Sequence, residues 1–293
     1  MKNHWLVTFA FVLGITAGDA LAQEPRLPQF PRDVHGLWWQ PIDPGWATAV
    51  FDHQTAMSSV LMIYDFDGTP TWFVASRLEC VREGSAGLNA NCFGPMYRVT
   101  APWFGDTFRN DQVGVTQVGE WEGWWSTPLF GGVGPNEGRV LYLTYSYDGW
   151  SIRPFGDQPM KAQVIDPELP FLFYNTSQSG LWADPDENGW GVGLFQQGQR
   201  LSATLFVHDR DRQPRWYVVN MKAPDLIFDA DRRYTGDVYE TRGSPFNERF
   251  TAELRVRRVG GATLRFGTEP DGPATLSYSI DGVTVTKTIF RVP

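Results

Sequence analysis

The chain has 293 residues, of which 42% are hydrophobic and 15% aromatic, and its formal net charge at pH 7 is −8. An acidic protein is repelled by phosphate backbones, so we expect no nucleic-acid partner. The length suits two domains of ordinary size better than one.

The N-terminus has the three parts of a secretory signal peptide. Lys2 precedes an almost wholly apolar run over residues 5–16, and Ala20-Leu21-Ala22 follows as a small-residue cleavage site. The run is too short to span roughly 30 Å of hydrocarbon, and no later stretch is apolar enough for a membrane helix. We expect residues 1–22 to be removed, residues 23–35 to begin the mature chain, and the protein to be periplasmic or extracellular.

The chain contains an internal duplication. Residues 36–76 and 180–220 align without a gap at an offset of 144. The tryptophans of the first copy recur in the second, as the pairs Trp38 and Trp182, Trp46 and Trp190, Trp72 and Trp216. We expect two homologous modules, module 1 over 36–153 and module 2 over 180–293, joined by a linker over 154–179.

Both modules are expected to be all-β. Short segments rich in Val, Thr, Tyr, Phe and Trp alternate with Gly, Pro, Asp and Asn, and no sustained helical period occurs. In module 1 strands are expected over residues 36–40, 46–53, 57–65, 71–78, 95–101, 113–119, 122–127, 139–146 and 150–154. Consecutive short strands of this kind predict two tandem antiparallel meanders that close into small barrels, with sandwiches as the alternative.

Cys80 and Cys92 are the two cysteines of the chain. In an oxidising compartment such a pair is expected to be joined. The sequence between them is polar and glycine-rich, so we predict a disulfide that fastens a hairpin loop.

The histidines do not indicate a catalytic or metal centre. His35, His53 and His208 remain after signal cleavage, and none of them recurs between the copies. A catalytic or metal-binding histidine of the ancestral repeat would be expected twice. We therefore expect no catalytic residues, no metal and no cofactor.

The recurring carboxylates have ordinary explanations. Asp65-Phe66-Asp67-Gly68 is similar to the start of a calcium loop but lacks its remaining ligands, so a hairpin turn is predicted. Asp43 and its counterpart Glu187 are candidate polar contacts at the mouth of a pocket. A hydrolase stays open as an alternative if one of them lies about 5–10 Å from a second carboxylate.

Tryptophans are the main candidates for ligand binding. The recurring candidates are Trp46, Trp72, Trp190 and Trp216, with core packing as the alternative for each. Trp121, Trp124 and Trp125 have no tryptophan counterparts in module 2. A cluster that the copies do not share is less expected in the common core, so these three are a candidate exposed apolar or sugar-stacking surface, with burial as the alternative.

The second strand of each module carries a stripe of small residues. Period-two alternation places Gly45, Ala47, Ala49 and Phe51 on one face, and the equivalent positions are Gly189, Gly191, Gly193 and Phe195. Such a stripe predicts a bulky group close to the backbone. That group is either a neighbouring tryptophan or a ligand inside the barrel.

The repeat resembles a unit of secreted proteobacterial proteins with the pattern G-L-W-x-x-P-x-x-x-G-W-G, followed by a D-x-D-G-x-P-x-W hairpin. Module 2 matches this pattern through Gly180-Leu181-Trp182, Pro185, Gly189-Trp190-Gly191, Asp209, Asp211, Pro214 and Trp216. Module 1 departs from it at Ala47, and module 2 departs at Arg212 and Gln213. This family has no characterised activity, so the resemblance implies secretion and β architecture.

A second resemblance is to calycin barrels, such as lipocalins and avidins. These begin with Gly-x-Trp, and an arginine of the last strand packs over the tryptophan. Here residues 36–38 open module 1 and Arg153 closes it, and residues 180–182 open module 2 and Arg291 closes it. The resemblance implies barrels with a guanidinium on the opening tryptophan.

Together these features favour a secreted, non-catalytic protein that binds a small apolar or amphipathic molecule in one or both barrels. The alternatives are a carbohydrate- or envelope-binding module that uses exposed tryptophans, a secreted hydrolase, and a structural repeat. Because module 1 lacks the glycine after Trp46, we expect mutation of Trp190 to impair binding more than mutation of Trp46.

Overall fold

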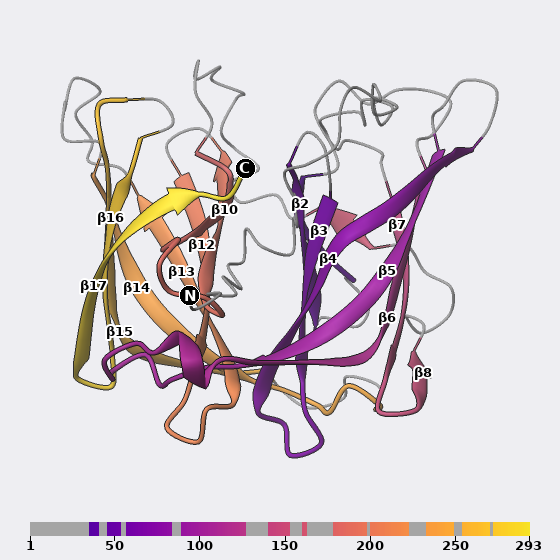
Figure 1. Ribbon diagram of the computed structural model, residues 1–293, viewed down its shortest axis with the longest axis horizontal. Coiled ribbons are helices and arrows are strands. Elements are labelled where there is room, and N and C mark those ends of the chain that lie inside the picture. Colours follow the sequence, from indigo (N-terminus) through magenta and orange to yellow (C-terminus); the bar gives the residue numbers. More distant parts are fainter. Residues whose placement is uncertain are drawn as a thin grey trace, which may run out of the picture.

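The computed structural model describes residues 35–40, 46–53, 57–83, 89–126, 140–152, 160–162, 178–197, 200–222, 233–248, 254–269 and 272–293. They form two β modules that lie side by side, module 2 on the left of Figure 1 and module 1 on the right. The all-β expectation is confirmed, since the regular structure consists of strands and the short 3₁₀ segment η2 (Asn110–Gln112). The expected signal peptide lies outside the described residues.

Module 2 is a closed barrel of eight antiparallel strands in chain order. Its strands are β10 (Gly180–Ala183), β11 (Gly191–Gln197), β12 (Arg200–His208), β13 (Pro214–Lys222), β14 (Arg233–Arg242), β15 (Arg255–Phe266), β16 (Ala274–Ile280) and β17 (Val283–Arg291). The barrel closes where Arg291 of β17 pairs with Trp182 of β10. Closure leaves no open strand edge.

Module 1 is a curled nine-stranded sheet of the order β8-β7-β6-β5-β4-β3-β2-β1-β9. Its strands are β1 (Gly36–Trp39), β2 (Ala47–Asp52), β3 (Met57–Tyr64), β4 (Pro70–Glu83), β5 (Asn89–Thr100), β6 (Gly114–Ser126), β7 (Val140–Tyr147), β8 (Trp150–Ile152) and β9 (Lys161–Ala162). Met160 exchanges backbone hydrogen bonds with Leu141 of β7, and Ala162 pairs with Trp38 of β1. The sheet of module 1 therefore continues beyond residue 153, into the expected linker.

One long strand, β6, replaces the two strands expected over 113–119 and 122–127. Gly119 reads as a break in the sequence, but it lies inside the sheet beside a β-bulge at Met96 and Tyr97. A Cβ on Gly119 would collide with the carbonyl of Ser146. Module 2 repeats this device with Gly260 and Ser279, so the glycine permits a close strand approach there and does not form a turn.

Each module has its own apolar interior, and a third apolar cluster lies between the modules. This junction contains Ala49, Phe51, Val60, Met62, Tyr64, Trp72 and Val74 of module 1, with Leu181, Phe195, Phe206 and Trp216 of module 2. Every residue of β3 is buried, and so is all of β12 except its first residue. These strands pack on their own interior with one face and on the other module with the opposite face.

The junction has approximate two-fold symmetry. Phe51 stacks on its equivalent Phe195, with ring centroids 5.7 Å apart. The β5–β6 loop of module 1 reaches module 2, where the backbone N–H of Phe104 donates to the carbonyl of His208 (3.3 Å). In return, the backbone N–H of Phe246 donates to the carbonyl of Tyr64 (2.9 Å). Figure 1 shows the β5–β6 loop, with η2, running beneath the barrel of module 2.

Candidate functional site

One polar cluster lies where the β5–β6 loop covers module 2. The Glu187 carboxylate accepts a hydrogen bond from Trp190 Nε1 at 3.0 Å and forms an ion pair with Lys287 Nζ at 2.5 Å. Lys287 lies between Val285 and Ile289 on the same face of β17, and these two side chains pack on the barrel interior. An inward-pointing lysine is therefore neutralised by Glu187, because a charge in this position needs a partner.

A cavity of about 10 Å³ lies beside this ion pair, with Phe104, Phe108, His208 and Tyr278 also in its wall. This is room for about one water molecule. Burial, with a smaller effect of the Glu187 charge, raises the pKa of Tyr278 above its usual range. Burial also lowers the pKa of His208 to about 4.

The cluster does not have the arrangement of a glycosidase centre. Asp106 is a second carboxylate in the wall of this cavity, but Glu187 is held in an ion pair with Lys287, whereas a hydrolytic pair needs two carboxylates on either side of a bound substrate. The cavity is too small for a sugar ring. The ion pair therefore accounts for Glu187 as a structural contact, and its counterpart Asp43 lies outside the described residues.

Two of the recurring tryptophans lie in the junction. Trp72 and Trp216 are 0% and 7% exposed, and each indole N–H donates to a carbonyl of the opposite module. The neighbouring module therefore occupies the space in which a ligand would contact them. Of the other pair, Trp190 is buried beside Glu187, and Trp46 contacts Tyr145 at the interior of module 1.

The stripe of small residues on the second strands also faces the junction. A Cβ on Gly193 would lie 2.9 Å from Cζ of Phe51, and one on Gly189 would lie 3.2 Å from side chains of Ala101, Val113 and Val99. The expected bulky neighbour is present, but the other module supplies it. Neither a tryptophan of the next strand nor a ligand in the barrel is needed to explain the stripe.

The expected arginine is found over the opening tryptophan of module 2. The guanidinium carbon of Arg291 lies 5.3 Å from the ring centroid of Trp182, close enough for a cation–π interaction. In module 1, Ala162 pairs with Trp38 at the equivalent register position. The expected Arg153 lies outside the described residues.

The three clustered tryptophans divide between two faces of β6, which corrects the expectation of one exposed surface. Trp121 and Trp125 are 0% and 2% exposed and point into module 1, with ring centroids 5.8 Å apart. Among the described residues, their Nε1 atoms have no hydrogen-bond partner, and an unpaired buried donor costs about 1–3 kcal/mol. Trp124 points outward, because successive side chains of a strand alternate between its faces.

Trp124 belongs to an outward-facing aromatic surface on β4 to β7, which we call the outer aromatic face; Trp124 and Tyr142 are half-buried in it. One cross-strand row contains Val81, Asn91, Trp124 and Tyr142, and the next contains Glu79, Phe93, Glu122 and Thr144. The rings of Trp124 and Tyr142 lie 5.2 Å apart. Asn91 Nδ2 donates to Glu122 Oε1 at 3.2 Å, and Phe93 and Val81 are 43% and 54% exposed.

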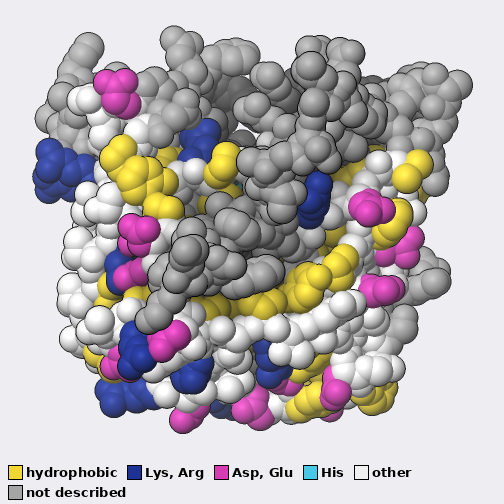
Figure 2. Space-filling model, in the orientation of Figure 1, with side chains coloured by type: hydrophobic (Ala, Val, Ile, Leu, Met, Phe, Trp, Pro, Cys, Tyr) yellow, Lys and Arg dark blue, Asp and Glu magenta, His cyan; other side chains and the backbone are white. Residues whose placement is uncertain are grey.

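The outer aromatic face combines apolar and hydrogen-bonding groups. Figure 2 shows hydrophobic side chains close to carboxylates over the same end of module 1. Large exposed apolar side chains that cluster with polar neighbours are typical of binding surfaces. This face is therefore the strongest candidate binding site among the described residues.

The fold itself does not require these rings. The matching register of module 2 places Thr235 where module 1 has Phe93, Arg265 in place of Trp124, and Thr275 in place of Tyr142. The same wall of module 2 has an open groove of about 470 Å³, lined largely by Ser, Thr and Gly. The same wall of the sheet therefore carries aromatic side chains in module 1 and polar or charged ones at the matching positions of module 2.

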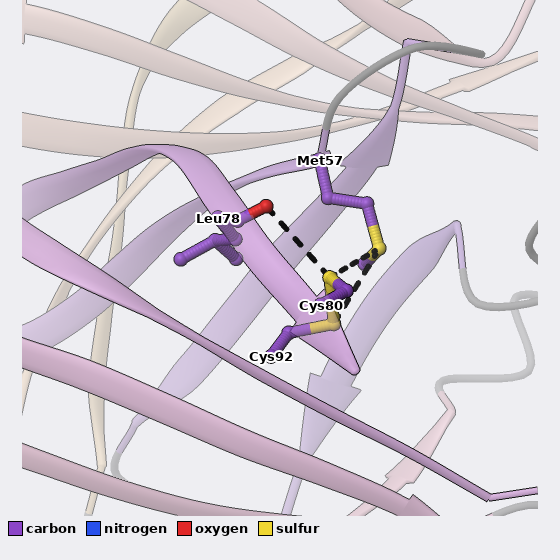
Figure 3. Close-up of a disulfide and its surroundings, with 4 residues drawn as sticks. All are labelled: Met57, Leu78, Cys80 and Cys92. Carbon is purple, nitrogen blue, oxygen red and sulfur yellow. Dashed lines mark hydrogen bonds between the residues drawn. A yellow bond between two sulfur atoms is a disulfide. The ribbon is translucent and has the colours of Figure 1, made fainter. Parts of the chain in front are cut away.

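The predicted disulfide lies beneath the outer aromatic face. Cys80 and Cys92 are directly opposite each other on β4 and β5 and are joined (Figure 3). Figure 3 also shows Met57, whose Sδ lies 3.7 Å from Sγ of Cys80. The bond holds the two strands that carry Val81, Asn91 and Phe93 in register.

Sequence reasoning missed Phe93, Tyr142, Asn91 and Glu122 as part of a surface. The signal was alternation, since Tyr142 lies between the buried Leu141 and Leu143. Lys287 was also missed, although it interrupts a similar series of inward-facing residues on β17.

The described residues contain no group of three or more His, Cys, Asp or Glu that could hold a metal ion. The predicted turn at Asp65–Gly68 is present, and there Asp67 Oδ1 accepts the backbone N–H of Thr69. Within the same residues, no helix is long and apolar enough to cross a membrane.

No family model, curated protein or solved structure matches the chain.

Proposed function

We propose that this protein is a secreted, non-catalytic binding protein that recognises a neutral glycan with the outer aromatic face of module 1. The observation that carries this proposal is the outward-facing aromatic group of Phe93, Trp124 and Tyr142, where module 2 has Thr235, Arg265 and Thr275. Phe93 is exposed, and Trp124 and Tyr142 are half-buried. Outward-facing rings that the fold does not need indicate a function of their own.

The chemistry of this face suits a sugar. The apolar C–H face of a pyranose can stack on the electron-rich face of an aromatic ring. Glu79 and Glu122 are exposed, and their carboxylates can accept hydrogen bonds from sugar hydroxyls. The same carboxylates and the net charge of −8 disfavour anionic polysaccharides.

Secretion is part of the proposal. It is supported by the apolar run over residues 5–16 and the small-residue site that follows it. The Cys80–Cys92 disulfide is consistent with an oxidising compartment. The resemblance of the repeat to secreted proteobacterial proteins points the same way.

The test is binding to insoluble cellulose and chitin and to soluble β-glucan and xylan, with alginate as an anionic comparator. We expect at least one neutral polymer to bind. Trp124→Ala and Tyr142→Ala should each weaken that binding about tenfold or more, as truncation of a central interface ring does. Trp150→Ala is the matched control, because Trp150 is 51% exposed on β8 but lies outside the outer aromatic face.

Two results would count against the proposal. One is that no neutral polymer of the panel is retained by the folded full chain. The other is retention that survives in the Trp124→Ala/Tyr142→Ala double variant, which would assign binding to another surface.

A further inference from the structure

Two histidines of module 1 contact module 2 across the junction. His35 directly precedes β1; its ring lies 5.6 Å from the ring of Phe195 and is hydrogen-bonded to the backbone of Leu194. His53 directly follows β2, and its Nδ1 donates to the carbonyl of Val292 at 3.3 Å. Both rings therefore belong to the contact between the modules.

The third histidine makes the same kind of contact from module 2. His208 Nε2 donates to the carbonyl of Val99 in module 1 at 3.0 Å, and its ring lies 5.5 Å from that of Trp72. The chain has no other histidine after residue 22. We propose that protonation of His35 and His208 opens the junction, so that acid separates the two modules while each module stays folded.

The surroundings of His208 disfavour a positive charge while the junction is closed. Burial is the main cause that lowers its pKa to about 4, and Arg212 and Arg215 act in the same direction. Asp209 acts in the opposite direction, but it is held in an ion pair with Arg215 at 2.6 Å. The remaining titratable groups near His208 line the small cavity and are the Glu187–Lys287 ion pair, the exposed Asp106, and Tyr278.

The charged groups that face His35 are both basic. Burial is again the main cause that lowers its pKa from 6.5 to about 4, and His53 and Arg291 add to the effect. Arg291 belongs to module 2, where it lies over Trp182. Bringing the modules together therefore places a cation of module 2 beside His35 and favours the neutral ring.

Opening the junction returns both rings to solvent, where an imidazole has its ordinary pKa of about 6.5. The open state then binds protons that the closed state does not, so the closed junction loses stability as the pH falls from about 6.5 to about 4. Full protonation shifts the ratio of open to closed molecules about 300-fold for each histidine, and up to about 10⁵-fold for the two together.

The modules have the means to stay folded when the junction opens. The buried apolar cluster of each module is distinct from the cluster of the junction, and the barrel of module 2 closes on its own strands. The histidine contacts described above all run between the modules, so their titration acts on the junction. The outer aromatic face lies on module 1 alone, which makes this proposal independent of glycan binding.

The test follows the full chain from pH 7 to pH 4 by small-angle X-ray scattering, far-ultraviolet circular dichroism and binding of an apolar fluorescent dye. We expect the radius of gyration and the dye fluorescence to rise together as the pH falls, because the apolar junction becomes exposed. The circular dichroism should keep its β-sheet form, and neutralisation should reverse the change. A radius of gyration that stays constant until the β-sheet signal is lost would overturn the proposal without reference to any variant.

The matched variant is His35→Gln/His208→Gln, which removes the two titrating rings and keeps every carboxylate of the chain. It should remain compact at pH 4 under conditions that open the wild type, and each single variant should open at a pH between those of the wild type and the double variant. Expansion of the double variant at the same pH as the wild type would overturn the proposal and assign the change to carboxylate titration.

Discussion

Trp72 and Trp216 each donate a hydrogen bond to a backbone carbonyl of the opposite module. Trp72 Nε1 donates to the carbonyl of Val207 at 3.3 Å, and Trp216 Nε1 donates to the carbonyl of Ile63, also at 3.3 Å. The donors are equivalent positions of the repeat, and so are the acceptors. The contact has the self-complementary form of a two-fold symmetric dimer interface, here contained in a single chain.

This reciprocity predicts equal effects from equivalent substitutions. Trp72→Phe and Trp216→Phe each remove one inter-module hydrogen bond and leave a small gap in the junction. We expect each to lower the free energy of unfolding by about 1–2 kcal/mol, with the two values agreeing within about 0.5 kcal/mol. Chemical denaturation followed by circular dichroism measures both. A large effect of one substitution and none of the other would show that the junction is not energetically symmetric.

The β5–β6 loop of module 1 contacts module 2, and the β14–β15 loop of module 2 contacts module 1, which predicts that each module stabilises the other. The ring of Phe246 contacts Phe66 and Tyr147 of module 1, with centroids 4.9 and 5.0 Å away. Since Phe246 is 9% exposed, Phe246→Ala should cost about 3 kcal/mol of unfolding free energy. The exposed Phe290→Ala is the control and should change it by less than about 0.5 kcal/mol. Similar losses of unfolding free energy in the two variants would mean that the contact of the β14–β15 loop with module 1 does not contribute to stability.

The order of the strands, the disulfide and the contact of Arg291 with Trp182 were accessible from the sequence, because each depends on local pattern or on position in the repeat. The junction was less accessible. Its signal was present in β3, whose residues Met57–Tyr64 lack a polar face, as expected of a strand buried on both sides. Sequence does not say whether a ligand, a helix or a second module covers the additional face.

Alternation within the expected strand over 122–127 already places the neighbours Trp124 and Trp125 on opposite faces. The inward face of that strand was harder to predict, for a different physical reason. Which residues of a strand face inward depends on unbroken alternation. The bulge beside Gly119 leaves Val118 without a partner on β5, so alternation counted from the start of β6 is out of phase beyond it. The sequence placed a strand end at Gly119, and the inward phase of the following residues stayed undetermined.

The ion pair of Glu187 and Lys287 predicts strong coupling between two substitutions. Lys287→Met leaves a largely buried carboxylate, 19% exposed, with the N–H of Trp190 as its remaining assigned donor. We expect a loss of about 1–3 kcal/mol of unfolding free energy. Adding Glu187→Gln should recover more than half of the loss, because an uncharged amide can still accept from Trp190. A double-mutant cycle from chemical denaturation measures this coupling.

The surface pair Arg109 and Asp111 is the control for that cycle, since both side chains are more than half exposed. We expect no measurable coupling there. If the Glu187 and Lys287 substitutions were simply additive, their ion pair would not contribute to the stability of the barrel end.

His208 predicts a loss of stability in weak acid. Its Nε2 donates to the carbonyl of Val99 at 3.0 Å, and burial lowers its pKa from 6.5 to about 4. Between these two values the unfolded chain binds a proton that the folded chain does not, so stability falls as the pH drops from about 6.5 to about 4. The contribution of His208 to that fall reaches about 3 kcal/mol at pH 4.

His208→Gln keeps a donor for Val99 but does not titrate. Compared with the wild type, its free energy of unfolding should depend less on pH between 6.5 and 4, and the two proteins should differ little in this dependence above pH 7. Urea denaturation at pH 7, 5.5 and 4 measures the difference. His35, whose pKa burial also lowers to about 4, remains in both proteins, so part of the acid sensitivity should persist in the variant. Parallel stability curves for the two proteins would show that His208 is protonated in the folded state as readily as in the unfolded chain.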